Sequence, residues 1–314
     1  MPGIHRLVEK AIGVKTEWVE RPCPLCGRQA DSPVFAEAAL DLDKLDEFAF
    51  ASRKLPEYMH TRLIECRQCG MVYGNPVLSP GTLASAYERA AFDSGSEAHY
   101  ASATYAAQVG RILDRLPDRM GALDIGTGDG GFLEELLNLG FQDVAGVEPS
   151  SAPIASAKPT IRPLIRSGLF RAEAFPEAAF SLITCFQTME HVWDPLETAR
   201  GAWRLLKPGG ALLIVVHNRK SVSARLLGMK SPIFDIEHLQ LFCPATAGQL
   251  LERAGFRDVT VASLWNRYPV SYWMKLLPAP RGVKRWLLGL LSESGTGRIP
   301  VALPAGNLIC LGFK

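Results

Sequence analysis

The sequence predicts an α/β protein with a doubly wound, mostly parallel seven-stranded sheet, preceded by a small zinc-ribbon-like domain. Three observations support this fold class. From residue 119 onward, short apolar segments alternate with helical segments of 8–14 residues. A glycine-rich stretch, ALDIGTGDGG, joins the first apolar segment to the first of these helices, and two Cys-x-x-Cys pairs lie nearer the N-terminus. Alternating strands and helices imply a parallel sheet covered on both faces.

The part of the chain before the sheet divides into three segments. Residues 1–20 are expected to form a lead-in with a short helix. Residues 21–78 are bracketed by CPLCG and CRQCG, with an acidic segment at 37–47 between the two pairs. Residues 79–116 carry apolar residues at helical spacing, which predicts a helical connector or lid. The core would then occupy residues 117–314.

Within the core, the strands and helices can be assigned in order. The expected strands are MGALDI, DVAGVE, PLIR, FSLITCF, ALLIVVH, DVTVASLW and NLICLGF. The expected helices are GFLEELLNLG, SAPIASA, PLETARGAWRLL and PATAGQLLERAGF. Gly140 and Gly255 would end the first and last of these helices, because glycine is the usual residue at a helix C-terminus. Residues 218–243 and 265–306 do not fit the alternation, so we expect them to be insertions.

Composition and charge exclude several classes of protein. The 314 residues are 47% hydrophobic and 21% charged, as in a soluble globular protein. The net charge of +2 argues against a nucleic-acid partner. No apolar run approaches the roughly 20 residues that span a bilayer. The N-terminus has no signal-peptide core, so a cytoplasmic location is expected.

The glycine-rich stretch fits two kinds of nucleotide site. Gly126, Gly128 and Gly131 form G-x-G-x-x-G, which is typical of dinucleotide enzymes. With Gly130, the same stretch forms G-x-G-x-G behind an acid, which is typical of S-adenosylmethionine sites. Glu148 lies at the end of the second strand, where a carboxylate can accept hydrogen bonds from ribose hydroxyls in either case.

Asp124 favours S-adenosylmethionine. It stands two residues before the first glycine, at the end of the first strand. A dinucleotide would place its pyrophosphate at the helix N-terminus beside this carboxylate, and two anions would repel. The sulfonium and ammonium groups of S-adenosylmethionine are cations and suit a carboxylate. The competing interpretation is that Asp124 only caps the helix.

Four motifs together resemble those of class I S-adenosylmethionine-dependent methyltransferases, which have a Rossmann-like fold. They are ALDIGTGDGG, GVEP, FSLITCFQTMEHVWDP and LLKPGGALLIVV. The resemblance covers about residues 105–264, with NLICLGFK as a final strand. The helix-LLKPGG-strand junction is especially typical of this family.

The resemblance implies which residues hold the cofactor. They are Asp124, Gly126, Gly128, Gly130, Glu148, Gly168, Leu169 and Gln187. The first four and Gln187 would line the methionine end, Glu148 would bind the ribose, and Gly168 and Leu169 would lie near adenine. Family members often have an acid where this chain has Leu169, so adenine would be held by backbone groups and Phe170.

The paired cysteines predict a structural zinc site. Two Cys-x-x-Cys knuckles supply four thiolates, which is a complete tetrahedral set with no open position for catalysis. The ligands would be Cys23, Cys26, Cys66 and Cys69. The 39 residues between the knuckles exceed the usual zinc-ribbon spacing, which indicates an inserted acidic helix. An odd total of seven cysteines and no export signal argue against disulfides, and the surroundings are not those of a redox pair.

The cysteine-rich head ahead of a methyltransferase core is similar to that of bacterial methyltransferases of sugar and polysaccharide biosynthesis. The segments that carry this resemblance are CPLCG, IECRQCGMVYGNPVLS and LASAY. Sugar C-methyltransferases share the head but have a longer C-terminal part, which weighs against C-methylation here.

Histidines are the candidates for a general base, because a hydroxyl acceptor benefits from one. His191 follows the fourth strand, at the edge where open sheets bind ligands, and is the first choice. His238 is the second choice, and His217 ends the fifth strand. The alternative for each is a hydrogen-bonded loop residue. QTMEH resembles the ExxEH metal-binding pattern of ubiquinone-pathway O-methyltransferases, but Gln187 replaces its first carboxylate, which argues against dependence on Mg²⁺.

Residues 270–291 mix tryptophans and leucines with lysines and arginines. One interpretation is a segment that meets a membrane surface or a lipid-linked acceptor. The favoured interpretation is a cap over the substrate whose leucines pack on the core.

The expected function is therefore methyl transfer from S-adenosylmethionine to a small-molecule acceptor, with a sugar or glycan-precursor hydroxyl as first choice. Two alternatives stay open, a zinc-containing RNA methyltransferase and a non-catalytic binding module with a methyltransferase fold. An NAD enzyme is disfavoured by Asp124 and by LLKPGG.

Overall fold

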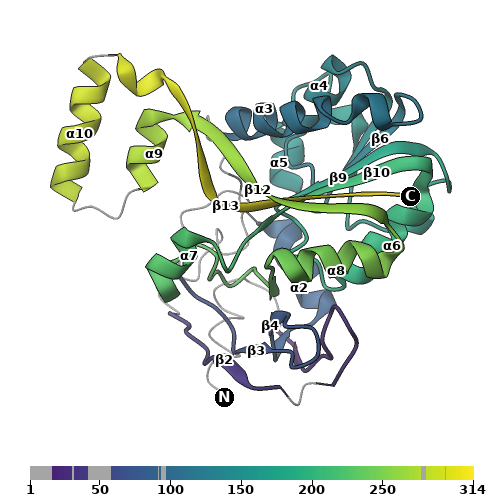
Figure 1. Ribbon diagram of the computed structural model, residues 1–314, viewed down its shortest axis with the longest axis horizontal. Helices are drawn as coiled ribbons and strands as arrows, with labels where there is room; N and C mark the ends of the chain where they lie inside the picture. The colour runs from purple at the N-terminus through teal and green to yellow at the C-terminus, as the bar shows by residue number, and fades with distance from the viewer. Residues whose placement is uncertain are drawn as a thin grey trace.

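The computed structural model describes residues 16–29, 32–41, 58–90, 92, 97–276, 281–293 and 295–314. Its centre is a seven-stranded sheet with the order β12-β13-β10-β9-β6-β7-β8 (Figure 1). The strands are β6 (Met120–Ile125), β7 (Gln142–Glu148), β8 (Ile165–Ser167), β9 (Phe180–Phe186), β10 (Leu206–His217), β12 (Arg257–Pro269) and β13 (Pro300–Phe313). All pair in parallel except β13, which is antiparallel to both of its neighbours. The predicted α/β fold class is confirmed.

Helices cover both faces of the sheet because its strands are apolar on both sides. The helices are α3 (Glu97–Gly110), α4 (Gly131–Asn138), α5 (Ser151–Ser156), α6 (Pro195–Leu205) and α8 (Pro244–Ala254). On β9, Leu182 packs in the cluster under α3 and α4, and its neighbour Ile183 packs in the cluster under α6 and α8. This alternation divides the core into two layers, as expected for a doubly wound sheet.

The order of the strands reverses at β6. The chain runs from β6 through β7 to β8 on one side and then returns to β9 and β10 on the other. Neighbouring loops therefore diverge at the carboxyl ends of β6 and β9 and leave a crevice, which is where open α/β sheets bind ligands.

The last two strands are longer than the sequence suggests. β12 continues to Pro269, and β13 begins at Pro300, which is its pairing partner. Both ends of the segment 265–306 therefore belong to the sheet. The hairpin carries α9 (Val270–Leu276) and α10 (Arg281–Glu293), which project from the body of the molecule (Figure 1).

A second, four-stranded sheet has the order β11-β4-β3-β2 and carries the cysteine region. Its strands are β2 (Val34–Ala36), β3 (Leu63–Glu65), β4 (Val72–Gly74) and β11 (Gln240–Leu241). Because β11 comes from the insertion 218–243, this insertion completes the sheet of the N-terminal region. The same insertion also contains α7 (Val222–Leu227).

The segments around this second sheet differ in part from expectation. Trp18–Val19 form β1, which pairs with β5 (Val77–Leu78), and α2 (Pro80–Arg89) follows. The short helix expected within residues 1–20 falls mostly outside the described residues. Of the expected acidic helix, residues 37–41 are not helical, because Ala39 forms a bridge with His60, and residues 42–47 lie outside the described residues.

Arg21 joins the two parts of the molecule. Its buried guanidinium donates hydrogen bonds to the carbonyl oxygens of Trp193 and Leu239, at 2.9 and 2.7 Å, and to the Gln240 side chain at 3.0 Å. Burial lowers its pKa to about 10, so it stays charged at neutral pH. The rings of Tyr73 and Trp193 lie 5.7 and 5.3 Å from it, which adds cation–π attraction.

Candidate functional site

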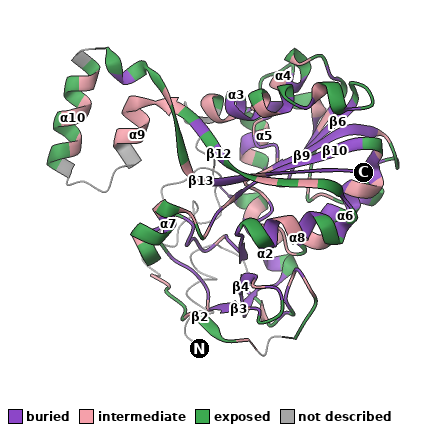
Figure 2. Cartoon of the chain, in the orientation of Figure 1, coloured by how far each residue is buried: buried purple, intermediate pink, exposed green. Residues whose placement is uncertain are grey.

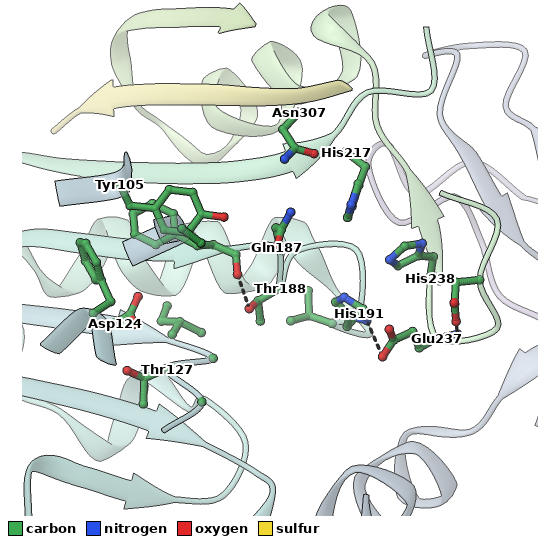
Figure 3. Close-up of a pocket in the computed structure, with 18 of the residues that line it drawn as sticks. Tyr105, Asp124, Thr127, Gln187, Thr188, His191, His217, Glu237, His238 and Asn307 are labelled. Carbon is green, nitrogen blue, oxygen red and sulfur yellow. Dashed lines mark hydrogen bonds and ion pairs between the residues drawn. The ribbon is translucent and has the colours of Figure 1, made fainter. Parts of the chain in front are cut away.

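A large pocket of about 1530 Å³ lies at the carboxyl ends of β6, β7, β9 and β10. This volume exceeds the roughly 300–1,000 Å³ that one small ligand usually needs, so the pocket has room for two. In Figure 3, Asp124 and Thr127 lie at one end, and His191, His217, His238 and Glu237 lie at the other. Gln187 and Thr188 lie between the two groups.

The glycine loop is shaped by its neighbours. Gly126 and Gly128 have φ values of +78° and +60°, which glycine adopts most readily. A side chain at Gly126 would collide with Thr188, so this position must stay small. Nothing lies within 4 Å of the place where a Cβ at Gly128 would stand. The backbone at Gly128 can therefore be approached closely by a ligand.

Glu148 holds the loop in shape. One of its carboxylate oxygens accepts a hydrogen bond from the Gly128 N–H at 2.8 Å, and the other accepts one from the Ser150 N–H at 2.9 Å. The side chain is buried at the end of β7 and lines the pocket. It therefore positions the loop in addition to facing any ligand bound there.

Asp124 is the most deeply buried carboxylate at this end of the pocket, with 3% of its surface exposed. Burial raises its pKa to about 7, although it accepts a hydrogen bond from the Thr184 hydroxyl at 2.7 Å, which favours the ionised form. A cation bound beside Asp124 would favour the ionised form further.

The other predicted cofactor residues occupy different places. Leu169 lines the pocket and is half exposed, and Phe170 beside it also lines the pocket. Gln187 lines it with a φ of +50°, a strained value for a non-glycine residue that is common at functional sites. Gly130 is the N-cap of α4 and lies against Ile161, and Gly168 donates its N–H to the Glu148 carbonyl oxygen. Neither is among the residues that line the pocket.

At the opposite end, Glu190 and His217 form a buried pair. Glu190 is completely buried, and its carboxylate accepts hydrogen bonds from the backbone N–H and the Nδ1 of His217, at 2.6 and 3.0 Å. Burial disfavours the charged form of both groups, but the hydrogen bond and the charge attraction between Glu190 and His217 outweigh this effect. The pKa of Glu190 is lowered to about 2, and the pKa of His217 is raised.

His191 and His238 come from separate segments and meet in the pocket. Their ring centroids lie 4.9 Å apart, and the ring of His217 lies 5.1 Å from that of His238. His191 Nδ1 lies 3.4 Å from a Glu237 carboxylate oxygen. His238 Nδ1 lies 2.8 Å from the Ile233 carbonyl oxygen, to which it must donate. Burial and the two neighbouring histidines lower the pKa of His238 to about 4, so its ring is neutral.

The structure also brings together residues that the sequence did not single out. Glu237, Tyr87 and Asn307 line the same pocket, from three distant parts of the chain. Glu237 had a visible signal, because it directly precedes His238 in FDIEHLQLF. Tyr87 and Asn307 had none, since only the fold brings α2 and β13 to this crevice.

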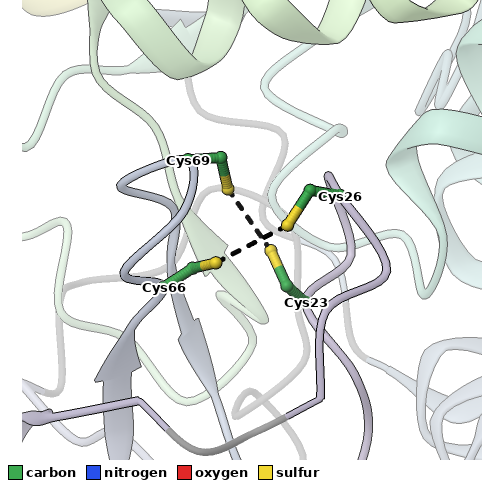
Figure 4. Close-up of side chains that lie close together, drawn as sticks. All are labelled: Cys23, Cys26, Cys66 and Cys69. Atoms are coloured by element: carbon green, nitrogen blue, oxygen red, sulfur yellow. Dashed lines mark hydrogen bonds between the residues drawn. The ribbon is translucent and has the colours of Figure 1, made fainter.

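The four paired cysteines converge, as Figure 4 shows. Their sulfur atoms lie within 4.8 Å of one another, with Cys23 and Cys69 at 3.5 Å and Cys26 and Cys66 at 3.6 Å. Four sulfurs bound to one Zn²⁺ at about 2.3 Å would stand about 3.8 Å apart, so the arrangement fits a tetrahedral zinc ion. The glycines that follow, Gly27 and Gly70, both have positive φ values, as the knuckle turns require.

The tip of the β12–β13 hairpin exposes large apolar side chains. Val283, Trp286 and Leu290 are exposed on α10, which is mostly exposed in Figure 2, so the favoured expectation that the leucines of residues 270–291 pack on the core is wrong at Leu290. Trp273 of α9 is among the residues that line the pocket. No helix within the described ranges is both long and apolar enough to cross a membrane.

Parts of this chain are similar in sequence to known methyltransferases. A ubiquinone biosynthesis O-methyltransferase of Pseudomonas putida is 36% identical over 106 residues, which cover 31% of this chain and 44% of that protein. A probable S-adenosylmethionine-dependent methyltransferase of Mycolicibacterium smegmatis is 29% identical over 149 residues, covering 46% and 56%. The chain thus spans about half the length of these relatives.

Solved structures with a similar fold include a possible histamine N-methyltransferase of Thermotoga maritima, with 20% identity and a TM-score of 0.46. The similarity covers 69% of this chain and 91% of that one. The profile of the family described as a methyltransferase domain matches residues 98–261, which are 164 of the 314 residues. This match covers more than half of the chain and contains the glycine loop, so the chain belongs to the methyltransferase domain family.

Proposed function

We propose that this protein transfers the methyl group of S-adenosylmethionine to a hydroxyl group of a small-molecule acceptor. The observation that carries the proposal is the large pocket, which has a glycine loop with two buried carboxylates at one end and three histidines at the other. The family match supports methyl transfer, and the volume supports two ligands in one cavity.

The cofactor would occupy the end formed by β6 and β7. Asp124 would face the positively charged part of S-adenosylmethionine, and Glu148 would accept hydrogen bonds from the ribose. Leu169 and Phe170 would provide an apolar surface for adenine, consistent with their exposure to the pocket. Gln187, between the two ends, would contact the methionine part near the reacting methyl group.

The acceptor would bind at the histidine end. Its oxygen would attack the methyl carbon, the bond from carbon to the sulfonium sulfur would break, and S-adenosylhomocysteine would leave with a neutral sulfur. The hydroxyl proton would pass to a nearby base. His191 is the first choice, because Glu237 at 3.4 Å would stabilise its protonated ring, and His238 is the second.

A sugar or glycan-precursor hydroxyl is the first choice of acceptor. Tyr268, Tyr272 and Trp273 line the pocket, with the Tyr268 ring 4.5 Å from that of Tyr272 and 5.4 Å from that of Trp273. Aromatic rings with polar edges suit a ligand that has both apolar faces and hydroxyls. A phenolic hydroxyl is the second candidate, favoured by the similarity to the ubiquinone biosynthesis O-methyltransferase.

The same proposal gives the cysteine region a structural role. Cys23, Cys26, Cys66 and Cys69 would hold one Zn²⁺, whose four thiolate ligands leave no position for a substrate. Elemental analysis of protein purified without chelator should give at least one zinc per chain. Protein that contains no zinc would contradict the assignment.

Calorimetric titration with S-adenosylhomocysteine tests the cofactor, with NADH as the control ligand. We expect binding of the first alone. Binding of NADH instead would overturn the proposal. An activity assay that follows formation of S-adenosylhomocysteine, run with nucleotide sugars and with simple phenols, would then decide between the two acceptor classes.

A further inference from the structure

The histidine end of the pocket contains a cluster that the reaction outlined above does not fully explain. One candidate ligand atom from each of His191, Glu237 and His238 lies within 4.8 Å of the other two. His191 follows β9, whereas Glu237 and His238 precede β11, so the fold brings two distant segments together here. All three side chains line the large pocket.

We propose that His191, Glu237 and His238 bind a divalent transition-metal ion that holds the oxygen of the acceptor. The metal-binding part of this inference stands alone, and the role given to the metal rests on the proposed methyl transfer. Two imidazoles and one carboxylate form a ligand set known from catalytic zinc sites, where a fourth position stays open for water or substrate.

The hydrogen bonds around His238 suit a metal ligand. Its Nδ1–H donates to the Ile233 carbonyl oxygen at 2.8 Å, which leaves the lone pair on Nε2. Metal-binding histidines usually donate their other ring N–H to a carbonyl or carboxylate in this way, because the bond fixes the ring and its tautomer. His238 is therefore held in the form that a metal requires.

The distances require only a small adjustment. His191 Nδ1 already lies 3.4 Å from a Glu237 oxygen, about the separation of two ligands on one ion. The largest separation within the cluster is at most 4.8 Å, so contraction by roughly an ångström would complete the site. Rotation of partly exposed side chains can supply this change.

The site differs from the ExxEH pattern that QTMEH resembles. That pattern would use positions 187 and 190, but position 187 is a glutamine, and Glu190 is engaged with the Nδ1 and backbone N–H of His217. Imidazole ligands favour Zn²⁺, Fe²⁺, Co²⁺ or Mn²⁺ over Mg²⁺, which prefers oxygen. The cluster therefore indicates a transition metal in place of magnesium.

A metal here would change what the histidines do. They would act on the acceptor through the ion, which would hold one or two adjacent hydroxyl oxygens toward the methyl group. A metal-bound hydroxyl ionises more easily, and its proton would leave to water. An acceptor with neighbouring hydroxyls, such as a sugar diol or a catechol, would bind with two oxygens.

Mn²⁺ is a suitable probe, because it favours oxygen and nitrogen ligands and competes poorly for the four thiolates. Titration of the 314-residue chain followed by electron paramagnetic resonance should show one site per chain. Glu237→Gln should weaken Mn²⁺ binding at least tenfold. Glu173→Gln, which makes the same change at another carboxylate of the pocket, should leave it unaltered. Equal affinity in both variants, or no bound Mn²⁺ in the wild-type protein, would overturn the inference.

A second measurement needs no variant. Bound Mn²⁺ should broaden the nuclear magnetic resonance signals of the His191, His217 and His238 rings more strongly than those of His60 and His99, because paramagnetic broadening falls steeply with distance from the ion. Equal broadening of all five would contradict the site. Calorimetry with S-adenosylhomocysteine on the same sample separates the two claims. Cofactor binding without Mn²⁺ binding would refute only the metal, and Mn²⁺ binding without cofactor binding would refute only the proposed methyl transfer.

Discussion

At the scale of single residues, Asp124 combines burial with a position beside the glycine loop. Its pKa of about 7 means that the folded protein keeps this proton until near-neutral pH, whereas the unfolded chain releases it near pH 4. The folded state therefore binds more protons between these values. The free energy of unfolding of the ligand-free protein should fall as the pH rises from about 4 to about 7.

Asp124→Asn should remove this part of the pH dependence. We expect the difference in unfolding free energy between the variant and the wild type to change by about 2–4 kcal/mol between pH 4 and pH 8, in favour of the variant at high pH. Urea denaturation at both pH values measures it. Asp129→Asn, in the same loop, is the control. An unchanged slope in Asp124→Asn would show that other groups cause the dependence.

Glu148 gives a second prediction at this scale. Glu148→Ala would leave the buried N–H groups of Gly128 and Ser150 without their acceptor, and each such loss costs about 1–3 kcal/mol. We expect lower stability and at least tenfold weaker binding of S-adenosylhomocysteine. Glu148→Gln keeps one acceptor oxygen and should be affected less. Glu134→Ala, on the surface of α4, should bind normally in the same calorimetric titration.

At the scale of elements, we expect the stability of the four-stranded sheet to depend on the zinc ion that the two knuckles would hold. The knuckle of Cys66 and Cys69 connects β3 to β4, the knuckle of Cys23 and Cys26 meets it through the sulfur contacts, and β4 pairs with β11. Cys66→Ser should therefore release zinc and lower the hydrogen-exchange protection of β3, β4 and β11. Cys243→Ser changes a buried cysteine outside the cluster and should retain the zinc. Unchanged protection in Cys66→Ser would show that the sheet does not depend on the metal.

The helix α10 is the second element with a testable role. Val283, Trp286 and Leu290 are exposed at helical spacing, with the basic Arg285 beside them, which is the arrangement of helices that lie on anionic membrane surfaces. The double variant Trp286→Ser, Leu290→Ser should lose co-sedimentation with phosphatidylglycerol vesicles and keep S-adenosylhomocysteine binding. If the wild-type protein fails to sediment with these vesicles, the membrane role is wrong and the cap role of the hairpin remains.

Some elements of the fold could be predicted from the sequence and others could not. The strands and helices of the central sheet were predictable, because apolar runs and helical spacing are local signals. β11 was not, since a two-residue strand forms only through its pairing with β4, which lies more than 160 residues earlier in the chain. The same holds for the site. The glycine loop could be identified from a motif, whereas the meeting of His191, Glu237 and His238 depends on tertiary contacts.

At the scale of the whole molecule, Arg21 joins the cysteine region to the core through hydrogen bonds to four residues, which are Gly74, Trp193, Leu239 and Gln240. Arg21→Lys keeps the charge but cannot reach several acceptors at once, because an ammonium lacks the planar fork. We expect a loss of about 2–4 kcal/mol in unfolding free energy. Arg67→Lys, on the surface of the cysteine region, should cause almost none, and equal melting temperatures for both variants would contradict this role.

The pairing of β11 with β4 makes the methyltransferase segment depend on the cysteine region. The segment that matches the methyltransferase family, residues 98–261, is not a physical unit, because three strands that begin within it pair with strands outside it: β11 with β4, and β10 and β12 with β13. Of these, β11 begins two residues after His238. A chain shortened to residues 98–261 would keep the glycine loop, but the histidine end of the pocket would lose the strand β4 that supports it. Residues 98–261 therefore cannot be moved into another protein on their own. An experiment that exchanges this segment between relatives in order to change the acceptor would have to include the cysteine region as well.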